Sequence, residues 1–93
     1  MSEGLDIVHH AIPGRFVVEV DGHVARLDYE QDQGVMHINH TVVPEAIGGR
    51  GIAGRLVQAA FRHARDEGWK VNPECSYAAD WAGRHPDVAD LLA

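Results

Sequence analysis

Residues 5–43 show no helical period in their hydrophobic positions, and short groups of turn residues divide them into segments. These turn signals are Pro13-Gly14, Asp21-Gly22 and Asp32-Gln33-Gly34. They predict strands at 15–20, 23–30 and 35–43, with residues 5–9 as a further edge strand. Asp21-Gly22 is typical of a tight hairpin, because both residues tolerate a positive φ. The first half of the chain is therefore expected to form an antiparallel meander.

From residue 52 the hydrophobic positions follow a period of 3.6 residues. The residues on one helical face are Ile52, Ala53, Leu56, Val57, Ala60, Phe61 and Ala64. They predict an amphipathic helix that ends at Gly68, followed by a strand at 69–74. A second helical segment is expected at 77–84, with a break at His85-Pro86 and a last turn at 87–92. The fold class is therefore α+β, with the main helix covering one face of the sheet.

The bulk composition is that of one globular domain, since the chain has 93 residues of which 45% are hydrophobic and 24% charged. Its formal net charge of −6 disfavours binding to nucleic acid or to an anionic membrane. There is no apolar run of about 18–20 residues, and the first residues lack the features of a signal peptide. The single Cys75 cannot form an internal disulfide. We therefore expect a cytoplasmic protein.

A glycine-rich turn joins the last meander strand to the main helix, with four glycines among residues 48–54. No Ser, Thr, Asp or Asn stands where it could cap the helix, so the first backbone N–H groups are left available. Such a helix start can bind a phosphate, and Arg50 and Arg55 add positive charge. The plain alternative is a flexible connection in which glycine only permits the turn.

Three phosphate-binding loops come into question for this turn. A Walker loop requires Lys followed by Ser or Thr after its last glycine, but Arg55 and Leu56 follow Gly54. A dinucleotide fingerprint matches Gly49-x-Gly51-x-x-Gly54, and Glu74 stands about 20 residues further on. That fold requires repeated βαβ units, which an antiparallel meander does not supply. The third loop is one of acyltransferases.

Gly48-Gly49-Arg50-Gly51-Ile52-Ala53 resembles the pyrophosphate loop of the GCN5-related N-acetyltransferases, Gln/Arg-x-x-Gly-x-Gly/Ala, from its third position onward. Gly48 stands where that family usually carries Gln or Arg. Nearly the whole chain is similar to the short YjdJ-like subgroup. The matching segments are Phe16–Asp21 with Gly22, His40-Thr41-x-Val43-Pro44, Gly49-Arg50-Gly51-Ile52-Ala53, Leu56-Val57-x-Ala59, Gly68-x-Lys70-Val71, Pro73-x-Cys75, Tyr77 and Arg84-His85-Pro86. The resemblance implies a reduced acyltransferase fold without helices between the first two strands.

The resemblance also implies an activity, the transfer of an acetyl group from acetyl-coenzyme A to an amine. In the family, the strand before the loop pairs with the pantetheine arm and the loop binds the pyrophosphate. This assigns the arm and the oxyanion to Thr41, Val42 and Val43. It assigns the pyrophosphate to Gly48, Gly49, Arg50, Gly51, Ile52, Ala53, Gly54 and Arg55. The acceptor is expected to be a small-molecule amine or a protein lysine. The alternative is a module that binds coenzyme A or a nucleotide without turnover.

Four residues are candidates for the chemistry. His40 has a pKa range suited to a general base, although its apolar neighbours Met36, Ile38 and Val42 equally allow a buried structural histidine. Glu74 is the second candidate base. Cys75 could carry the acetyl group or protonate the leaving sulfur, or be a small buried hydrophobe. Tyr77 is a second candidate acid, or a packing residue.

The seven histidines do not predict a metal site. His37 and His40 are three apart on a predicted strand, so we expect them on opposite faces of the sheet. The adjacent His9 and His10 are also expected to point apart. The spacing therefore argues against zinc.

Overall fold

The computed structural model of the chain describes residues 5–93. Residues 1–4, which belong to the predicted domain, lie outside the described residues. Five strands form one sheet in the order β1 to β5. Their bounds are β1 Val8–His10, β2 Arg15–Val20, β3 His23–Asp32, β4 Val35–Val42 and β5 Lys70–Pro73. The first four are antiparallel, as predicted, and β5 runs parallel to β4.

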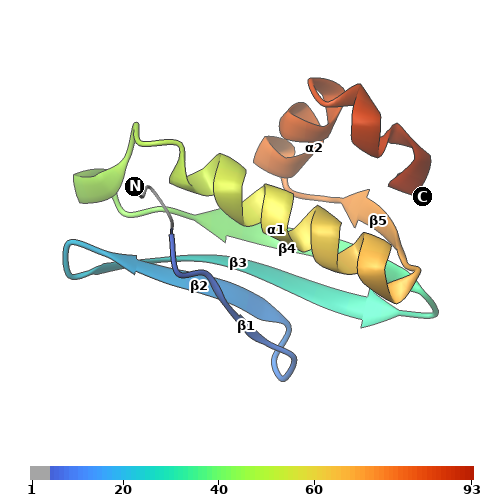
Figure 1. The fold of residues 1–93 in the computed structure, drawn as a ribbon, viewed down its shortest axis with the longest axis horizontal. Coiled ribbons are helices and arrows are strands. Elements are labelled where there is room, and N and C mark those ends of the chain that lie inside the picture. The colour runs from blue at the N-terminus through green and yellow to red at the C-terminus, as the bar shows by residue number, and fades with distance from the viewer. Residues whose placement is uncertain (1–4) are drawn as a thin grey trace.

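The helices follow the meander in the chain and lie against one side of the sheet (Figure 1). Their bounds are η1 Glu45–Ile47, α1 Ile52–Glu67, α2 Ser76–Gly83 and η2 Pro86–Leu91. The long helix α1 lies along the sheet, while α2 and η2 pack beside it and β5. The predicted α+β class and the order of the elements are confirmed. No helix among residues 5–93 is long and apolar enough to cross a bilayer.

The ends of α1 follow from its sequence. Gly51 at its start and Gly68 at its end both have left-handed backbone, with φ of 77° and 76°. The N–H group of Gly68 donates to the carbonyls near the end of the helix, which is the expected role of a glycine there. Asp21 and Gly22 also have positive φ, as predicted for the tight turn between β2 and β3.

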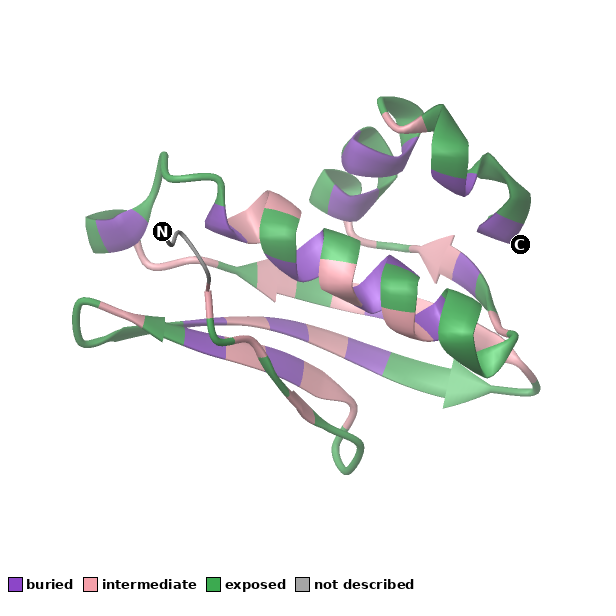
Figure 2. Cartoon of the chain, in the orientation of Figure 1, coloured by how far each residue is buried: buried purple, intermediate pink, exposed green. Residues whose placement is uncertain are grey.

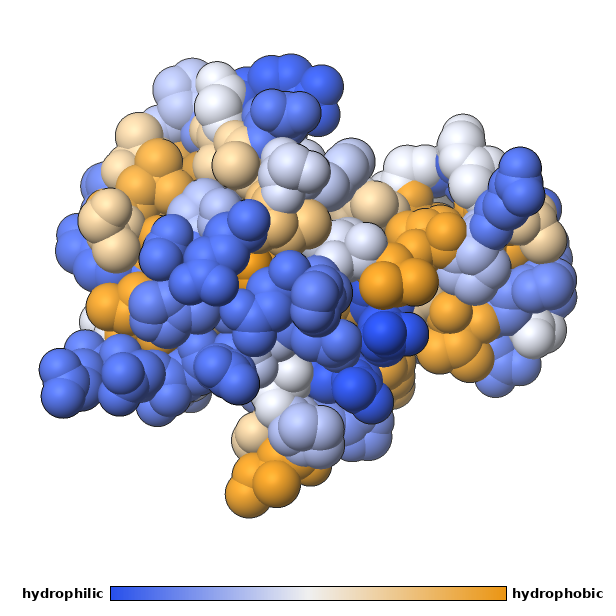
Figure 3. Space-filling view, turned by 180° about the vertical axis from the view of Figure 1, so that it is seen from behind, coloured by the Kyte–Doolittle hydropathy of each residue, from blue (hydrophilic) through white to orange (hydrophobic). Residues whose placement is uncertain are grey.

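The core lies between α1 and the sheet, and in Figure 2 the buried positions recur along the side of α1 that faces the strands. Its largest fully buried side chains are Phe61, Leu27, Met36, Ile38, Ile47, Leu56, Val57 and Val71. No helix of residues 5–93 covers the other face of the sheet (Figure 1). From behind, hydrophilic residues fill the middle of the molecular surface, with smaller apolar groups around them (Figure 3).

Several predicted boundaries differ from the structure by a few residues. The edge strand covers Val8–His10 instead of residues 5–9, because its pairing with β2 begins only at Val8. Strand β3 continues to Asp32, since it pairs with β4 up to a tight turn. In that turn, Gln33 and Gly34 have positive φ.

A β-bulge in β4 changes the face on which His40 lies. Asp28 pairs with His40 and Tyr29 pairs with Ile38, so that Asn39 is an extra residue with no partner on β3. The alternation of side chains is therefore shifted by one position after Ile38. His40 follows Asp28 onto the uncovered face and is exposed. The alternative that His40 is a buried structural histidine is therefore wrong.

The same bulge overturns the predicted arrangement of two histidines. His37 pairs with Glu30 before the bulge, and His40 pairs with Asp28 after it. Glu30 and Asp28 are two apart on β3, so they share a face of the sheet. His37 and His40 therefore lie on the same face, not on opposite faces. Even so, residues 5–93 contain no group of three or more His, Cys, Asp or Glu placed to hold a metal ion.

Candidate functional site

The glycine-rich turn leaves β4 through η1 and enters α1 at Gly51. Gly49 has a φ of 78° and Gly51 a φ of 77°. A Cβ atom built at either position would meet no atom within 4 Å. These two glycines are therefore required by the left-handed backbone and not by crowding.

A run of backbone N–H groups in this turn has no acceptor among residues 5–93. The N–H groups of Ile47 and Gly48 donate to the carbonyls of Pro44 and Glu45, and the N–H group of Arg55 donates to the Gly51 carbonyl at 3.2 Å. Between them, the N–H groups of residues 49–54 make no such bond, and no side chain caps α1. These donors stand at the positive end of a 16-residue helix, where an anion is stabilised.

A cavity of about 270 Å³ adjoins these donors. It is lined by Val43, Ile47, Gly48, Gly49, Gly51, Ile52, Ala53 and Tyr77. Tyr77 comes from the first turn of α2, and its side chain crosses to the first turn of α1. A Cβ atom at Gly54 would lie 3.4 Å from the Tyr77 hydroxyl. The lining of the cavity therefore combines the predicted phosphate loop with Tyr77, which lies far from the loop in the sequence.

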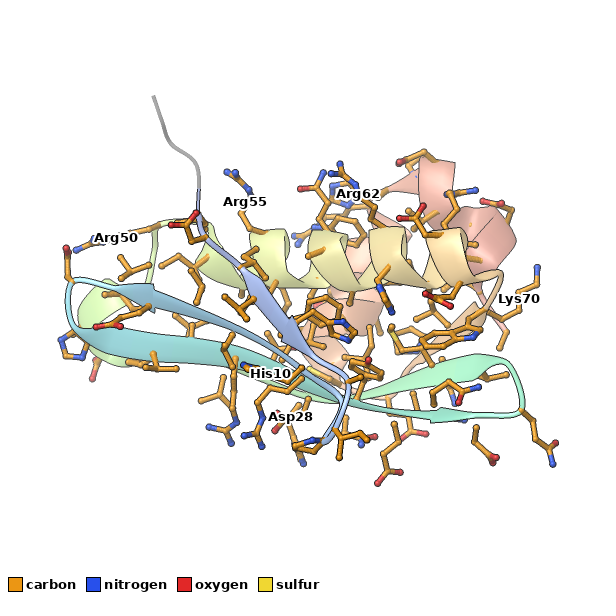
Figure 4. The ribbon with its side chains drawn as sticks, turned by 60° about the horizontal axis from the view of Figure 1, so that its bottom comes forward. His10, Asp28, Arg50, Arg55, Arg62 and Lys70 are labelled. Carbon is orange, nitrogen blue, oxygen red and sulfur yellow. The ribbon has the colours of Figure 1, made fainter. Side chains whose placement is uncertain are left out.

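The two arginines near the turn do not line this cavity. Arg50 Nη1 donates to Asp21 Oδ2 at 2.7 Å, which directs its side chain to the turn between β2 and β3. Arg55 projects from the start of α1 into solvent (Figure 4). Arg62, two turns further on, projects on the same side. Both predicted cationic residues thus lie near the glycine turn but outside its cavity.

The pairing of β4 with β5 ends just before the site. Ile38 and Pro73 form the last pair, and the N–H groups of Glu74 and Cys75 both donate to the Ile38 carbonyl, at 3.1 and 3.0 Å. Thr41 lies beyond this point, opposite buried Leu27 and so on the α1 side of the sheet. The two strands therefore separate on the way to the glycine turn.

Cys75 lies where the strands separate, and its thiol donates to Thr41 Oγ1 at 3.6 Å. Burial raises the pKa of the Cys75 thiol, but the N–H group of Ala78 and the Thr41 hydroxyl stabilise the thiolate more strongly, with a further contribution from Tyr77 N–H. The net effect lowers the pKa. Ala78 and Tyr77 belong to the first turn of α2, and Cys75 stands at the N-cap position of this helix. The positive end of the helix favours the thiolate, although the Cys75 side chain makes no capping hydrogen bond.

The remaining candidates lie on the uncovered face of the sheet. Glu74 Oε2 is 3.1 Å from His37 Nδ1, and Asn72 Nδ2 donates to the same oxygen at 3.4 Å. His40 is exposed on this face beside Asp28. The structure thus brings Thr41, Cys75 and Tyr77 to the helical side and separates them from His40 and Glu74.

A family model of the GCN5-related N-acetyltransferases matches residues 15–91. The chain belongs to this family. It is also similar to the solution structure of a GCN5-like N-acetyltransferase candidate from Staphylococcus aureus, with a TM-score of 0.77 and 25% sequence identity. The similarity covers 99% of this chain and 91% of that one. The predicted family and fold are confirmed, and both comparisons point to acetyl transfer, which in this family generally uses acetyl-coenzyme A. The predicted subgroup stays a prediction.

The residues of this GCN5-related chain fit the diphosphate of coenzyme A. Six consecutive N–H groups at 49–54 lack a partner among the described residues, and the cavity lining contains no carboxylate. Glycine at 48, 49 and 51 keeps the backbone free of side chains on the side where an anion would approach. The backbone of Thr41 to Val43 runs along the separated edge of β4, where it could pair with an extended arm.

The contact between His37 and Glu74 is not predicted from the sequence. The two residues are 37 positions apart, and their contact depends on the parallel pairing of β4 with β5. The bulge at Asn39 also had to be known before His37 and His40 could be placed on one face. The sequence carries no local signal of either feature.

A larger hollow of about 850 Å³ lies at the other end of α1. His9 in this hollow contacts the Tyr29 hydroxyl and stacks on Phe16. Burial, followed by the nearby His63, lowers the pKa of His9. Among the described residues no buried side-chain donor or acceptor lacks a partner. The buried polar side-chain atoms that the structure describes in this hollow therefore have partners within the protein.

Proposed function

We propose that this chain transfers the acetyl group of acetyl-coenzyme A to an amine. The observation that carries the proposal is the run of N–H groups at 49–54, which have no partner among residues 5–93 and open α1 beside a cavity whose described lining holds no carboxylate. These groups bind the diphosphate. The backbone of residues 41–43 pairs with the pantetheine arm, which leads to the point where β4 and β5 separate beside Cys75.

The acceptor approaches from the uncovered face of the sheet. An ammonium group must lose a proton before its nitrogen can attack a carbonyl carbon. Glu74, hydrogen-bonded to His37, and the exposed His40 are the bases on that face. Cys75, with its lowered pKa, acts on the other side of the sheet, either as a proton donor or as a nucleophile.

The acceptor is a cationic amine, either a small metabolite or a protein lysine. The net charge of −6 favours such a ligand over nucleic acid or an anionic membrane. A reducing compartment such as the cytoplasm would keep Cys75 available as a thiol.

One observation favours a second function, a coenzyme A-binding module without turnover. Glu74 and His40 lie on the opposite face of the sheet from the Cys75 thiol, and among residues 5–93 neither side chain makes a hydrogen bond to it. Bases and thiol act together only if the substrates fill the gap between the strands. A turnover assay therefore separates the two functions, although they share one binding site.

Thermal denaturation with added ligands tests the binding site that both functions need. A ligand at about 100 times its dissociation constant adds about 2.7 kcal/mol to the unfolding free energy. We expect coenzyme A to raise the melting temperature more than NAD or ATP at equal concentration. A larger rise with NAD would favour a dinucleotide site instead.

Incubation with acetyl-coenzyme A and a panel of amines tests the chemistry. Mass spectrometry should detect an acetylated amine and release of coenzyme A. Cys75→Ala should slow this transfer and leave the affinity for coenzyme A unchanged, because the diphosphate site is formed by backbone groups elsewhere. If Cys75→Ala turns over at the wild-type rate, Cys75 has no part in the reaction.

A further inference from the structure

Of the described residues that line the cavity of the glycine turn, Tyr77 alone has a polar side chain. The other seven are Val43, Ile47, Gly48, Gly49, Gly51, Ile52 and Ala53. Tyr77 is 37% exposed and lines the cavity, so a ligand in the cavity can reach it. Its hydroxyl lies over the first turn of α1, 3.4 Å from where a Cβ atom of Gly54 would be.

No Arg, Lys, Ser or Thr side chain stands among the described residues that line the cavity. Gly48 has no side chain at the first position of the loop. Arg50 is held by Asp21 through a 2.7 Å ion pair, and Arg55 projects into solvent. Among the described residues that line this cavity, Tyr77 of α2 is therefore the one that can offer a side-chain donor to a ligand.

The position of this hydroxyl follows from the close packing of α2 against α1. A Cβ atom built at Gly54 on α1 would lie 3.4 Å from the hydroxyl, which is an ordinary contact distance, so the two helices approach closely here. The indole nitrogen of Trp81, one turn further along α2, lies 3.6 Å from the same Cβ position. Trp81 is buried and packs on Phe61, so the contact between α1 and α2 is part of the core.

We propose that the Tyr77 hydroxyl donates a hydrogen bond to the diphosphate of coenzyme A and supplies the side-chain donor that Gly48 does not. This inference rests on the proposed function, because it assigns a role within the same site. Tyr77 is then a ligand-binding residue. Its hydroxyl lies at the phosphate end of the site, over Gly54, while the Cys75 thiol contacts Thr41 on β4.

Isothermal titration with coenzyme A measures the effect of Tyr77→Phe, which keeps the ring and removes only the hydroxyl. The loss of a hydrogen bond to a charged group should weaken binding about ten-fold or more. In a turnover assay, the KM for acetyl-coenzyme A should rise by a similar factor. The matched control is Tyr29→Phe, which removes a hydroxyl at the other end of α1 and should leave the affinity unchanged.

Phosphorus NMR of bound coenzyme A locates the contact within the ligand. The diphosphate resonances should differ between wild type and Tyr77→Phe, whereas the 3′-phosphate resonance should not. Equal affinities of the two proteins would overturn the inference, as would a fall in turnover at unchanged affinity, which is the result expected for a proton donor. If wild-type protein gives no binding heat, the proposed function itself fails, and this outcome is distinct from the other two.

Discussion

Replacing Gly51 by Ala or by Asp separates backbone strain from charge at the predicted phosphate site. Gly51 has a φ of 77° at the start of α1, so any other residue is strained there by about 1–2 kcal/mol. For a domain of this size, each kcal/mol lowers the melting temperature by about 4–8 °C. A carboxylate near the positive end of the helix recovers about 0.3–1 kcal/mol. Without ligand, Gly51→Asp should therefore be at least as stable as Gly51→Ala.

With ligand, the order of the two variants should reverse. Two like charges about 5 Å apart near a protein surface repel each other by about 3 kcal/mol, which corresponds to a loss of affinity of about 100-fold. Thermal denaturation with coenzyme A should thus show stabilisation of Gly51→Ala and almost none of Gly51→Asp. Gly83→Asp, which adds the same charge at an open position of α2, is the control and should respond as wild type does. Equal responses of the two Gly51 variants would refute the assignment of the diphosphate to this turn.

Three further predictions concern single contacts. Thr41→Val removes a hydroxyl that stabilises the Cys75 thiolate and should therefore raise the pKa of the thiol. The pH at which iodoacetamide alkylates Cys75 at half the maximal rate should then move upward. If this pH does not move, the contact is absent in solution. Burial raises the pKa of Asp28, but Arg15 and Arg26 lower it by more, so the net pKa is lowered. The two ion pairs therefore stabilise the fold above pH about 4, and this stabilisation is lost as the pH falls through the lowered pKa. Asp28→Asn should therefore cost about 1 kcal/mol at pH 7 by urea denaturation, with a difference from wild type that shrinks in acid; a constant difference would contradict this. Gly54→Ala should stabilise the ligand-free protein by about 0.5–1 kcal/mol, because alanine favours the helix and its Cβ atom meets the Tyr77 hydroxyl at an ordinary contact distance; a lower melting temperature would show that the space is already filled.

The elements that could be predicted from the sequence are those fixed by local chemistry. The main helix begins at Ile52 and ends before Gly68, as its apolar period and the glycine that follows it required. The Asp21-Gly22 turn joins two strands in the register that a two-residue hairpin imposes. In each case the deciding residues are neighbours in the chain, so no tertiary contact had to be known.

The site was predicted less completely, because its geometry depends on contacts between distant segments. The bulge at Asn39 has no sequence signature, yet it moves His40 to the uncovered face. Arg50 is predicted to bind the diphosphate from its place in the loop, whereas the ion pair of its side chain with Asp21 of a distant turn has no local signal in the sequence. The sequence indicates Tyr77 as an acid or a packing residue. Its place in the cavity of the glycine turn depends on the packing of α2 against α1, which the sequence does not show.

The most direct test of the account is a nitrogen–proton correlation NMR titration of the labelled protein with coenzyme A. The amides of residues 49–54 make no hydrogen bond to a described residue, so a bound diphosphate should change their resonances most and slow their exchange with solvent. We predict the largest changes at Gly49 and Gly51, with smaller ones at Thr41. Binding that leaves these amides unchanged, or that perturbs the hollow around His9 instead, would contradict the account.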